Sequence, residues 1–416
     1  MAENSAFKLW PPGSFPLCVE TALDAQATAD LEYVSNKVRE ATNQLPVLGL
    51  ILTGSVARGE GALIAESIGN VRWLSDLEFQ VVLSGTPRVS SREVDKLLRG
   101  LEHDINGGLS SQRRGLRVGF NWISAFQLQH LRPAIFSREM LEHGKLLWGK
   151  PTTIAPPQWW RDGSTDIPLL DAFRLLNNRT VQLVDARLTY ETQSGGQVLA
   201  AYILQKFWIE LATSLSVFLG CYRTRYRERR TALAAALGER PELFGEARQL
   251  LLARLDQAIE VKLGRIGPTG CTDESFKEAA AMAATVWNWE TAQMLGRRLT
   301  GADWDTVLER FRRLEPRDQR LRDWARLARG RSVRQFVRDA RSAFRAGSFA
   351  NAVYVAGCLL AFFWDDVATD DCRGAQLRST ISRLVGSKNV PGAEGRAALA
   401  RAVVAGWERH LHFAPR

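Results

Sequence analysis

The feature that most constrains the fold of this chain is a change in its apolar pattern after about residue 150. Before that point, short strand-type apolar runs alternate with helical segments, whereas after residue 168 almost every segment carries apolar residues at helical spacing. This order predicts an α+β protein, with a small mixed-sheet domain followed by a large all-helical domain. A length of 416 residues agrees, because it exceeds what one ordinary core accommodates.

The first region is predicted to contain strands and helices in alternation. Strands are expected at residues 47–53, 76–83 and 116–123, and helices at residues 27–42 and 91–106. Residues 64–74, between the first two strands, are expected to form a loop or a disrupted helix. These elements together are of the size expected for one domain.

The segment KPTTIAPPQWWRDGSTDIP, residues 150–168, is rich in Pro, Gly, Ser and Thr and is typical of a linker. We therefore place one domain at residues 1–150, the linker at 151–168 and the helical domain at 169–416. A break near residues 264–272 would divide the helical domain into two subdomains. The helices expected in it span residues 169–189, 196–222, 227–237, 241–263, 273–300 and 303–314.

The sequence predicts a cytoplasmic protein without a membrane anchor. The N-terminus has no basic segment followed by an apolar core, so a signal peptide is not expected. The most apolar later run, residues 352–364, is shorter than the roughly 20 residues of a membrane span and predicts a buried helix. The five cysteines of the chain are scattered, with neither a CxxC pair nor the spacing of zinc ligands, so they are expected to be reduced packing residues.

The net charge of +10 could reflect an anionic partner, or simply a GC-rich genome that encodes Arg in place of Lys. The partner could be a nucleic acid, or the positive charge could serve a cleft for a nucleoside triphosphate. The nucleic acid is the less favoured of these partners, because only the charge supports it and no RNA-binding motif is present. No feature of the sequence specifies an oligomeric state.

The segment GSVARGE, residues 54–60, follows the first predicted strand directly. A turn of this kind, with a helix behind it, presents backbone N–H groups and a hydroxyl to one point, as phosphate-binding turns do. Gly54 would let the backbone approach a phosphate closely, and Ser55 would add its hydroxyl. Arg58, one helical turn later, would add positive charge. A plain strand-to-helix turn is the alternative.

Asp76 and Glu78 lie two residues apart in the segment SDLEF, at the start of the second predicted strand. Residues i and i+2 of a strand share a face, so these carboxylates are expected side by side. Two like charges at such a distance need a cation between them, and Mg²⁺ suits a few carboxylates together with water and substrate phosphates. A solvated face on an edge strand is the alternative. Beside a phosphate turn, the pair predicts metal-assisted chemistry on a nucleotide phosphate.

Gly54-Ser55 together with Asp76-x-Glu78 resembles the nucleotidyltransferase superfamily, which includes DNA polymerase β and the aminoglycoside nucleotidyltransferases. The segments GSVARGE and SDLEF resemble the bacterial branch that acts on small acceptors more than the polymerase branch. The segments FSREMLEHGKLLWG (136–149) and AYILQK (201–206) add to the similarity, which covers about residues 30–235. The resemblance implies a nucleotidyltransferase domain at residues 1–150, a bound nucleoside triphosphate, Mg²⁺ held by Asp76 and Glu78, and both carboxylates as catalytic residues.

The resemblance also implies a third carboxylate from a later strand, which this chain lacks at the matching place. Residues 116–122 carry Gly119 or Asn121 there, and an Asn can ligate a metal but cannot accept a proton. Glu139 is the nearest candidate for the missing base. In similar enzymes, a helix of the second domain supplies a lysine to the triphosphate, and Lys206 matches it, with Tyr202 as a further candidate contact on that helix. A Lys that packs its stem on an apolar surface is the alternative.

Three functions follow from these residues. The leading one is Mg²⁺-dependent transfer of a nucleotidyl group to a hydroxyl of a small molecule, such as an aminoglycoside-like sugar or another metabolite. The second keeps this chemistry but acts on an RNA end or a protein side chain. The third is a catalytically impaired, antitoxin-like protein that binds nucleotide without turnover.

Overall fold

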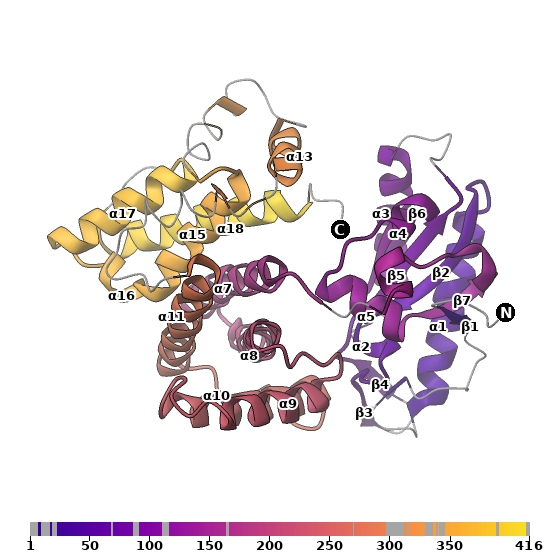
Figure 1. The fold of residues 1–416 in the computed structure, drawn as a ribbon, viewed down its shortest axis with the longest axis horizontal. Coiled ribbons are helices and arrows are strands. Elements are labelled where there is room, and N and C mark those ends of the chain that lie inside the picture. The colour runs from indigo at the N-terminus through magenta and orange to yellow at the C-terminus, as the bar shows by residue number, and fades with distance from the viewer. Residues whose placement is uncertain are drawn as a thin grey trace. The chain divides into compact units, whose positions relative to one another are not determined.

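The computed structural model divides the chain into two compact units, which are considered separately (Figure 1). Unit 1 comprises Met1–Pro168 and Glu260–Gly267, and unit 2 comprises Leu169–Ile259 and Pro268–Arg416. The structure describes residues 7–9, 17–18, 23–67, 70–85, 91–109, 116–163, 166–268, 270–296, 312–313, 315, 317–328, 336–337, 340, 346–387 and 391–412. Within these residues, unit 1 combines strands with helices and unit 2 is helical, which confirms the α+β prediction.

Unit 1 is built on a five-stranded mixed sheet with the order β1-β7-β2-β5-β6. Its central strand β2 pairs antiparallel with both β5 and β7, whereas β5 pairs parallel with β6 and β1 pairs parallel with β7. The strands are β1 (Lys8–Leu9), β2 (Val47–Thr53), β5 (Leu77–Leu83), β6 (Val118–Ser124) and β7 (Lys145–Gly149). The three strands expected from the sequence are β2, β5 and β6. The expectation missed β1 and β7, which are short.

Helices cover both faces of this sheet, and each face has its own apolar core. On one face, α1 (Asp24–Ala41) and α3 (Ser91–Leu109) pack on inward residues such as Leu52, Phe79 and Phe120. On the other face, α4 (Ala125–Gln129) and α5 (Ile135–His143) pack on Ile51 and Val82. Because neighbouring residues of a strand point to opposite faces, β2 and β5 supply both cores.

The outer edge of β6 is closed by side chains of α3. Asn106 Oδ1 accepts from Val118 N at 2.8 Å, and Glu102 Oε1 accepts from Phe120 N at 2.5 Å. Trp122 Nε1 donates to Asp95 Oδ1 at 2.8 Å. These bonds satisfy backbone groups that an edge strand otherwise leaves free, and they hold β6 in register against β5.

Residues 64–74 contain a β-hairpin, so the expectation of a loop or a disrupted helix is wrong. Strands β3 (Leu63–Ser67) and β4 (Asn70–Trp73) pair antiparallel as a separate two-stranded sheet. Buried Trp73 anchors the hairpin to α1, because its Nε1 donates to Asp30 Oδ2 at 2.7 Å.

The segment expected as a linker carries two short helical turns, η2 (Pro151–Thr153) and α6 (Gln158–Arg161), and is grouped with unit 1. Trp159 and Trp160 of α6 pack against the core beneath α4 and α5. Trp159 Nε1 donates to the Leu131 carbonyl at 2.6 Å. The end of this segment is therefore tied to the sheet domain.

Unit 2 is a helical bundle centred on α7 and α8, which pack along each other. Helix α15 packs against α7, α17 and α18, and α11 packs against α7 and α8. The break expected at residues 264–272 falls between α10 and α11, and the helix expected at 303–314 lies outside the described residues except for 312 and 313. The helices are α7 (Leu169–Thr192), α8 (Gln197–Phe218), α9 (Tyr226–Gly238), α10 (Ala247–Lys262), α11 (Asp273–Leu295), α13 (Arg317–Ala328), α15 (Phe349–Phe362), α16 (Trp364–Val367), α17 (Cys372–Val385) and α18 (Gly392–His412).

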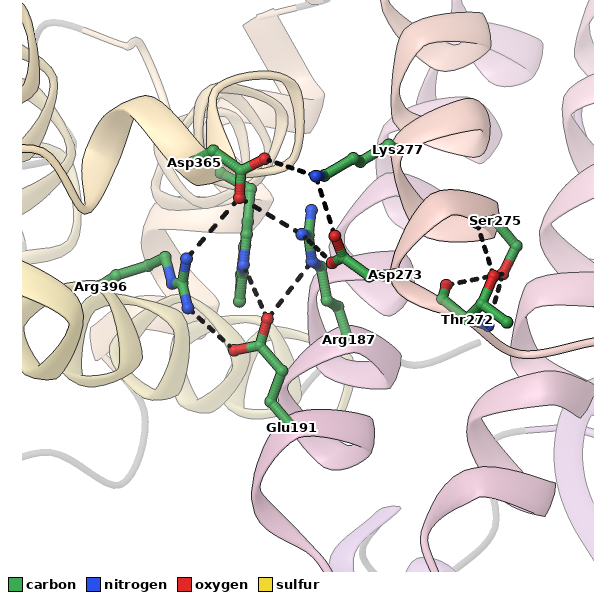
Figure 2. A network of polar contacts seen from close by, with 9 residues as sticks. Arg187, Glu191, Thr272, Asp273, Ser275, Lys277, Asp365 and Arg396 are labelled. Atoms are coloured by element: carbon green, nitrogen blue, oxygen red, sulfur yellow. Dashed lines mark hydrogen bonds and ion pairs between the residues drawn. The ribbon is translucent and has the colours of Figure 1, made fainter.

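An ion-pair network links α7, α11, α16 and α18 (Figure 2). Arg187 Nη2 lies 2.6 Å from Asp273 Oδ1, and Arg396 Nη2 lies 3.1 Å from Glu191 Oε2. These two guanidinium groups also lie 4.9 and 4.7 Å from the centre of the Trp364 ring. Since a charged network with an aromatic member has geometric requirements, it helps specify how these four helices meet.

One described helix, α8, is long and apolar enough to cross a membrane by length and composition, and 67% of its most apolar window is buried inside the structure. Such burial is typical of the core helix of a soluble protein. Helix α15, which contains most of the apolar run 352–364, is also largely buried, as expected. All five cysteines are free, but Cys372 is exposed and is therefore not the packing residue expected from the sequence.

Glu290 of α11 is a carboxylic acid inside the core of unit 2. Its side chain is fully buried, Oε1 accepts from Ser214 Oγ at 2.8 Å, and Oε2 has no partner among the described residues. Burial raises the pKa of the Glu290 carboxyl well above its ordinary value of 4.5, and the Ser214 hydrogen bond offsets this only in part. The neutral acid is therefore the form that the fold accommodates.

We predict that the parent loses stability as pH rises because Glu290 ionises, and that Glu290→Gln does not show this loss. A carboxyl whose pKa is raised on folding contributes stability below its unfolded value of 4.5 and loses it as pH rises toward the folded pKa. The amide does not titrate, so the gain of the variant over the parent in thermal midpoint should grow as pH increases above that value. Parallel curves for parent and Glu290→Gln would contradict the assignment.

Candidate functional site

Three strand ends meet at one edge of the sheet in unit 1. Strand β2 ends at Thr53 there, while β5 and β6 both begin there. Thr53 pairs with Glu78, and its Oγ1 donates to the Glu78 carbonyl at 3.1 Å. The sheet therefore places the start of the first predicted motif, at Gly54, beside the second motif, which contains Glu78.

Asp76 and Glu78 point to the same face of the sheet. Both are exposed, and they alternate with buried Ser75, Leu77 and Phe79. Within the described part of the chain, neither carboxylate has a hydrogen-bond or ion-pair partner. This alternation is consistent with both carboxylates lying on one face of the sheet, next to the strand ends, and their sharing of a cation stays a prediction.

Gly54 lies next to the Glu78 carboxylate of this pair. It adopts a φ of +74°, and a Cβ at this position would lie 3.0 Å from Glu78 Oε2. A side chain is therefore disfavoured by the backbone conformation, and it would also have to displace the Glu78 carboxylate slightly. The helix that Gly54 begins, α2 (Gly54–Ala57), is a single turn packed against β5 and α5.

Ser55 lies below the surface of the turn. Its side chain is buried, and Oγ donates to Ser75 Oγ at 3.4 Å. Ser75 Oγ in turn accepts from Ala62 N at 3.0 Å. The Ser55 hydroxyl thereby links the turn to the residue before Asp76, and its contact with a phosphate stays a prediction.

Arg58 and Glu139 form an ion pair with each other instead of facing Asp76 and Glu78 as free groups. Arg58 Nη1 lies 2.7 Å from Glu139 Oε2, and Arg58 Nε lies 2.9 Å from Glu60 Oε2. The Arg58 side chain is only 4% exposed. Two carboxylates offset the guanidinium charge, so Arg58 ties α2 to α5. Its predicted phosphate contact, and proton acceptance by Glu139, would each require part of this arrangement to open.

Strand β6 supplies no third carboxylate to this face. Gly119 pairs with Glu78 and Asn121 pairs with Gln80. A Cβ built on Gly119 meets no atom within 4 Å, so the position opposite Glu78 is open space. In the described part of the chain, no group of three or more His, Cys, Asp and Glu side chains could hold a metal ion.

Asp76 and Glu78 nevertheless fit Mg²⁺ as a substrate-associated ion. Mg²⁺ commonly takes one or two protein carboxylates and completes its octahedron with water and substrate phosphates. Two exposed, unpartnered carboxylates on one strand face provide such a donor set. A closed cage of protein ligands is not needed for that ion.

Lys206 and Tyr202 lie in unit 2, on α8, and are not assigned to the described face of unit 1. They are four residues apart and both half-buried. This spacing puts them on one side of the helix, one turn apart. Their contact with a triphosphate stays a prediction.

Two residues of this face were missed by the sequence analysis: Arg117, which comes just before β6, and Gln80, in the middle of β5. For Gln80 the signal was its position two residues after Glu78 on the same predicted strand. For Arg117 it was the alternation of apolar and polar residues over 116–121, which places Arg117, Gly119 and Asn121 on one side. Without the register between β5 and β6, that alternation does not say which residues they lie beside.

No known protein-family model matches this chain, and neither a curated protein nor a solved structure matches it. The functional assignment therefore depends on the geometry of the described site and on the resemblance of its motifs. Membership of the nucleotidyltransferase superfamily is accordingly a proposal.

We predict that Gly54→Ala displaces the Glu78 carboxylate and destabilises unit 1. The positive φ should cost about 1–2 kcal/mol for a residue with a side chain, and the methyl group would also press on Glu78 Oε2. Chemical denaturation of parent and variant measures this loss. Gly100→Ala is the matched control, because Gly100 is helical and open, so alanine should stabilise it by roughly 0.5–1 kcal/mol. Equal stability of parent and Gly54→Ala would contradict the close packing at this turn.

Proposed function

We propose that this protein transfers a nucleotidyl group from a nucleoside triphosphate to a hydroxyl of a small-molecule acceptor. The observation that carries the proposal is the pair of exposed, unpartnered carboxylates of Asp76 and Glu78 beside the turn at Gly54. As exposed charges they are hydrated and need no partner in the fold, so both are free to bind a cation. The resemblance of the two motifs to nucleotidyltransferases supports the same function.

In the proposed reaction, the acceptor hydroxyl oxygen attacks the α-phosphorus of the triphosphate. A new P–O bond forms to the acceptor, the bond between the α-phosphorus and the bridging oxygen breaks, and pyrophosphate leaves with the electron pair. The hydroxyl proton passes to a site carboxylate or to water. No redox change or further reactant is needed.

Asp76 and Glu78 are the residues that would hold Mg²⁺, which when bound supplies charge neutralisation to the phosphate oxygens. Gly54 keeps the turn close to Glu78 without a side chain in the way. Ser55 and Thr53 fix that turn through their bonds to Ser75 Oγ and to the Glu78 carbonyl. Lys206 is proposed to add a cation to the triphosphate from unit 2.

The acceptor is proposed to be small, an aminoglycoside-like sugar or another metabolite, and the protein to act in the cytoplasm. The same chemistry on an RNA end or a protein side chain is the alternative, and the net charge of +10 favours the RNA. RNA binding that weakens steeply with salt would support the RNA acceptor, whereas salt-insensitive turnover of a sugar would support the small one.

A second candidate function is nucleotide binding without turnover. Two observations favour it: Gly119 leaves the position opposite Glu78 empty, and Glu139 is already paired with Arg58. A site that holds the nucleotide but lacks a general base would bind and release it unchanged. Measured pyrophosphate release separates this candidate from the transferase.

We predict that Asp76→Asn and Glu78→Gln each abolish nucleotidyl transfer while leaving the fold intact. Each change removes one negative charge from the proposed metal site and keeps the side-chain volume. Pyrophosphate release in the presence of Mg²⁺ measures the loss, and circular dichroism checks the fold. Asp104→Asn, at an exposed position of α3, is the control and should keep full activity. Turnover near that of the parent in either site variant would overturn the metal assignment.

We also predict the outcome of Gly119→Asp. Gly119 has no positive φ and faces open space, so an aspartate can be accommodated opposite Glu78 without strain. If the parent binds nucleotide without turnover, this substitution should confer pyrophosphate release by restoring a third carboxylate. Turnover by the parent itself would remove the impaired-binder candidate. Gly107→Asp, another open glycine in unit 1, is the control and should confer no activity.

A further inference from the structure

The structure assigns Arg117 and Gln80 to the ligand-binding face of this site, and we propose that Arg117 contacts the phosphates of the bound nucleotide while the Gln80 amide donates to another acceptor atom of it. This inference deepens the proposed function and rests on it. Neither residue belongs to the two motifs: Gln80 follows Glu78 by two residues on β5, and Arg117 reaches the site through the register of β5 and β6.

Burial along β5 and β6 shows which residues share a face of the sheet with Glu78. On β5, buried Leu77 alternates with exposed Glu78, and on β6 buried Val118 follows exposed Arg117. Leu77 pairs with Val118, so the exposed neighbours of both lie on the opposite face. Arg117 is therefore on the same face as the two carboxylates.

The register places Arg117 beside Asp76 at the end of the sheet. Leu77 N donates to the Arg117 carbonyl at 2.8 Å, which shows that the ladder between the two strands begins at this level. Asp76 and Arg117 each immediately precede this first paired level, on neighbouring strands. In the described part of the chain, the Arg117 guanidinium has no hydrogen-bond or ion-pair partner, although a carboxylate lies on the adjacent strand.

A phosphate ligand explains why an arginine is left there. Arg58, the cation expected at this site, is committed to Glu60 and Glu139. A triphosphate carries more negative charge than one divalent ion offsets, and a guanidinium binds phosphate oxygens in a bidentate manner. Arg117 can supply that charge from within the same unit as Asp76 and Glu78.

Gln80 provides a second, independent observation. The residue is only 4% exposed, and its Nε2 has no hydrogen-bond partner among the described residues. It shares the face of Glu78, two residues further along β5, where it pairs with Asn121. A buried amide donor without a partner is unfavourable, so a ligand acceptor atom at this point would stabilise the complex.

The residues of this face are spread along the strand, which suits an extended ligand better than a lone ion. Asp76 and Gln80 are four residues apart, which corresponds to about 13 Å along a strand. Midway between them, Gly119 contributes no side chain, and a Cβ there would meet nothing within 4 Å. This face thus carries the Arg117 guanidinium and the two carboxylates at the end of the sheet where β5 and β6 begin. It carries no side chain at Gly119, and the buried Gln80 amide lies further along β5.

The test measures equilibrium binding of two probes with Mg²⁺, an α,β-methylene ATP analogue and inorganic triphosphate, to the full chain. Arg117→Met should weaken both probes by roughly ten- to a hundredfold, because one charge-assisted contact is lost. Arg117→Lys should retain an intermediate affinity, since it keeps the charge but not the fork. Arg99→Met, at an exposed position of α3, is the control and should bind as the parent does.

Gln80→Met tests the inner end of the face. Removing an unpartnered donor should raise the thermal midpoint of the ligand-free protein, and it should weaken the ATP analogue more than inorganic triphosphate. If Gln80 were only a packing residue, the midpoint would change but both probes would bind unaltered, and the assignment of Gln80 would be overturned.

The outcomes separate this inference from the proposed function. If Asp76→Asn loses binding while Arg117→Met keeps it, the inference falls and the proposed site stands. Arg117-dependent binding without pyrophosphate release would uphold the inference and overturn the transferase. A parent that binds neither probe would overturn both.

Discussion

The pairing of β5 with β2 on one side and β6 on the other determines the chemistry available to unit 1. Because Thr53 pairs with Glu78 and Leu77 pairs with Val118, the end of one strand and the starts of two others meet at the same edge. A slip of one residue in either pairing would turn Glu78 into the apolar core and Phe79 outward. The register is held by two apolar cores, one on each face, and by the α3 side chains that bond to the outer edge of β6.

The tie between α2 and α5 serves the same geometry. Arg58 is buried between Glu60 and Glu139, and removing either carboxylate would leave a charge less compensated in a nearly water-free place. This arrangement fixes the short α2 turn against a longer helix, and with it the position of Gly54 over Glu78. An arginine that looks like a phosphate ligand in the sequence thus acts as a positioning residue in the ligand-free structure.

The sequence predicted what depends on local periodicity. Strand β2 was expected at its observed bounds, and β5, β6, α1, α3 and the first helices of unit 2 differ from expectation by a few residues at their ends. The hairpin β3–β4 was missed, β1 is too short to show a period of two, and β7 shows no alternation of buried and exposed residues. The shared face of Asp76 and Glu78 followed from alternation alone.

What could not be predicted are the contacts between residues distant in the chain. The partner of Arg58 lies 81 residues away, and the position of Arg117 beside Asp76 depends on a parallel pairing that no local pattern encodes. The open space at Gly119 is likewise a property of the surrounding side chains rather than of the glycine. Whether the second unit brings Lys206 to this face stays a prediction.

The ligand-free site is a place where this fold is less stable than it could be. Two carboxylates on one strand face repel each other, and the Gln80 amide is buried without a partner among the described residues. The surrounding sheet, with its two apolar cores and its capped edge, compensates for both. A cation between the carboxylates and an acceptor atom at Gln80 would remove both penalties at once, so binding would stabilise unit 1 through the same residues that selection for stability alone would have replaced.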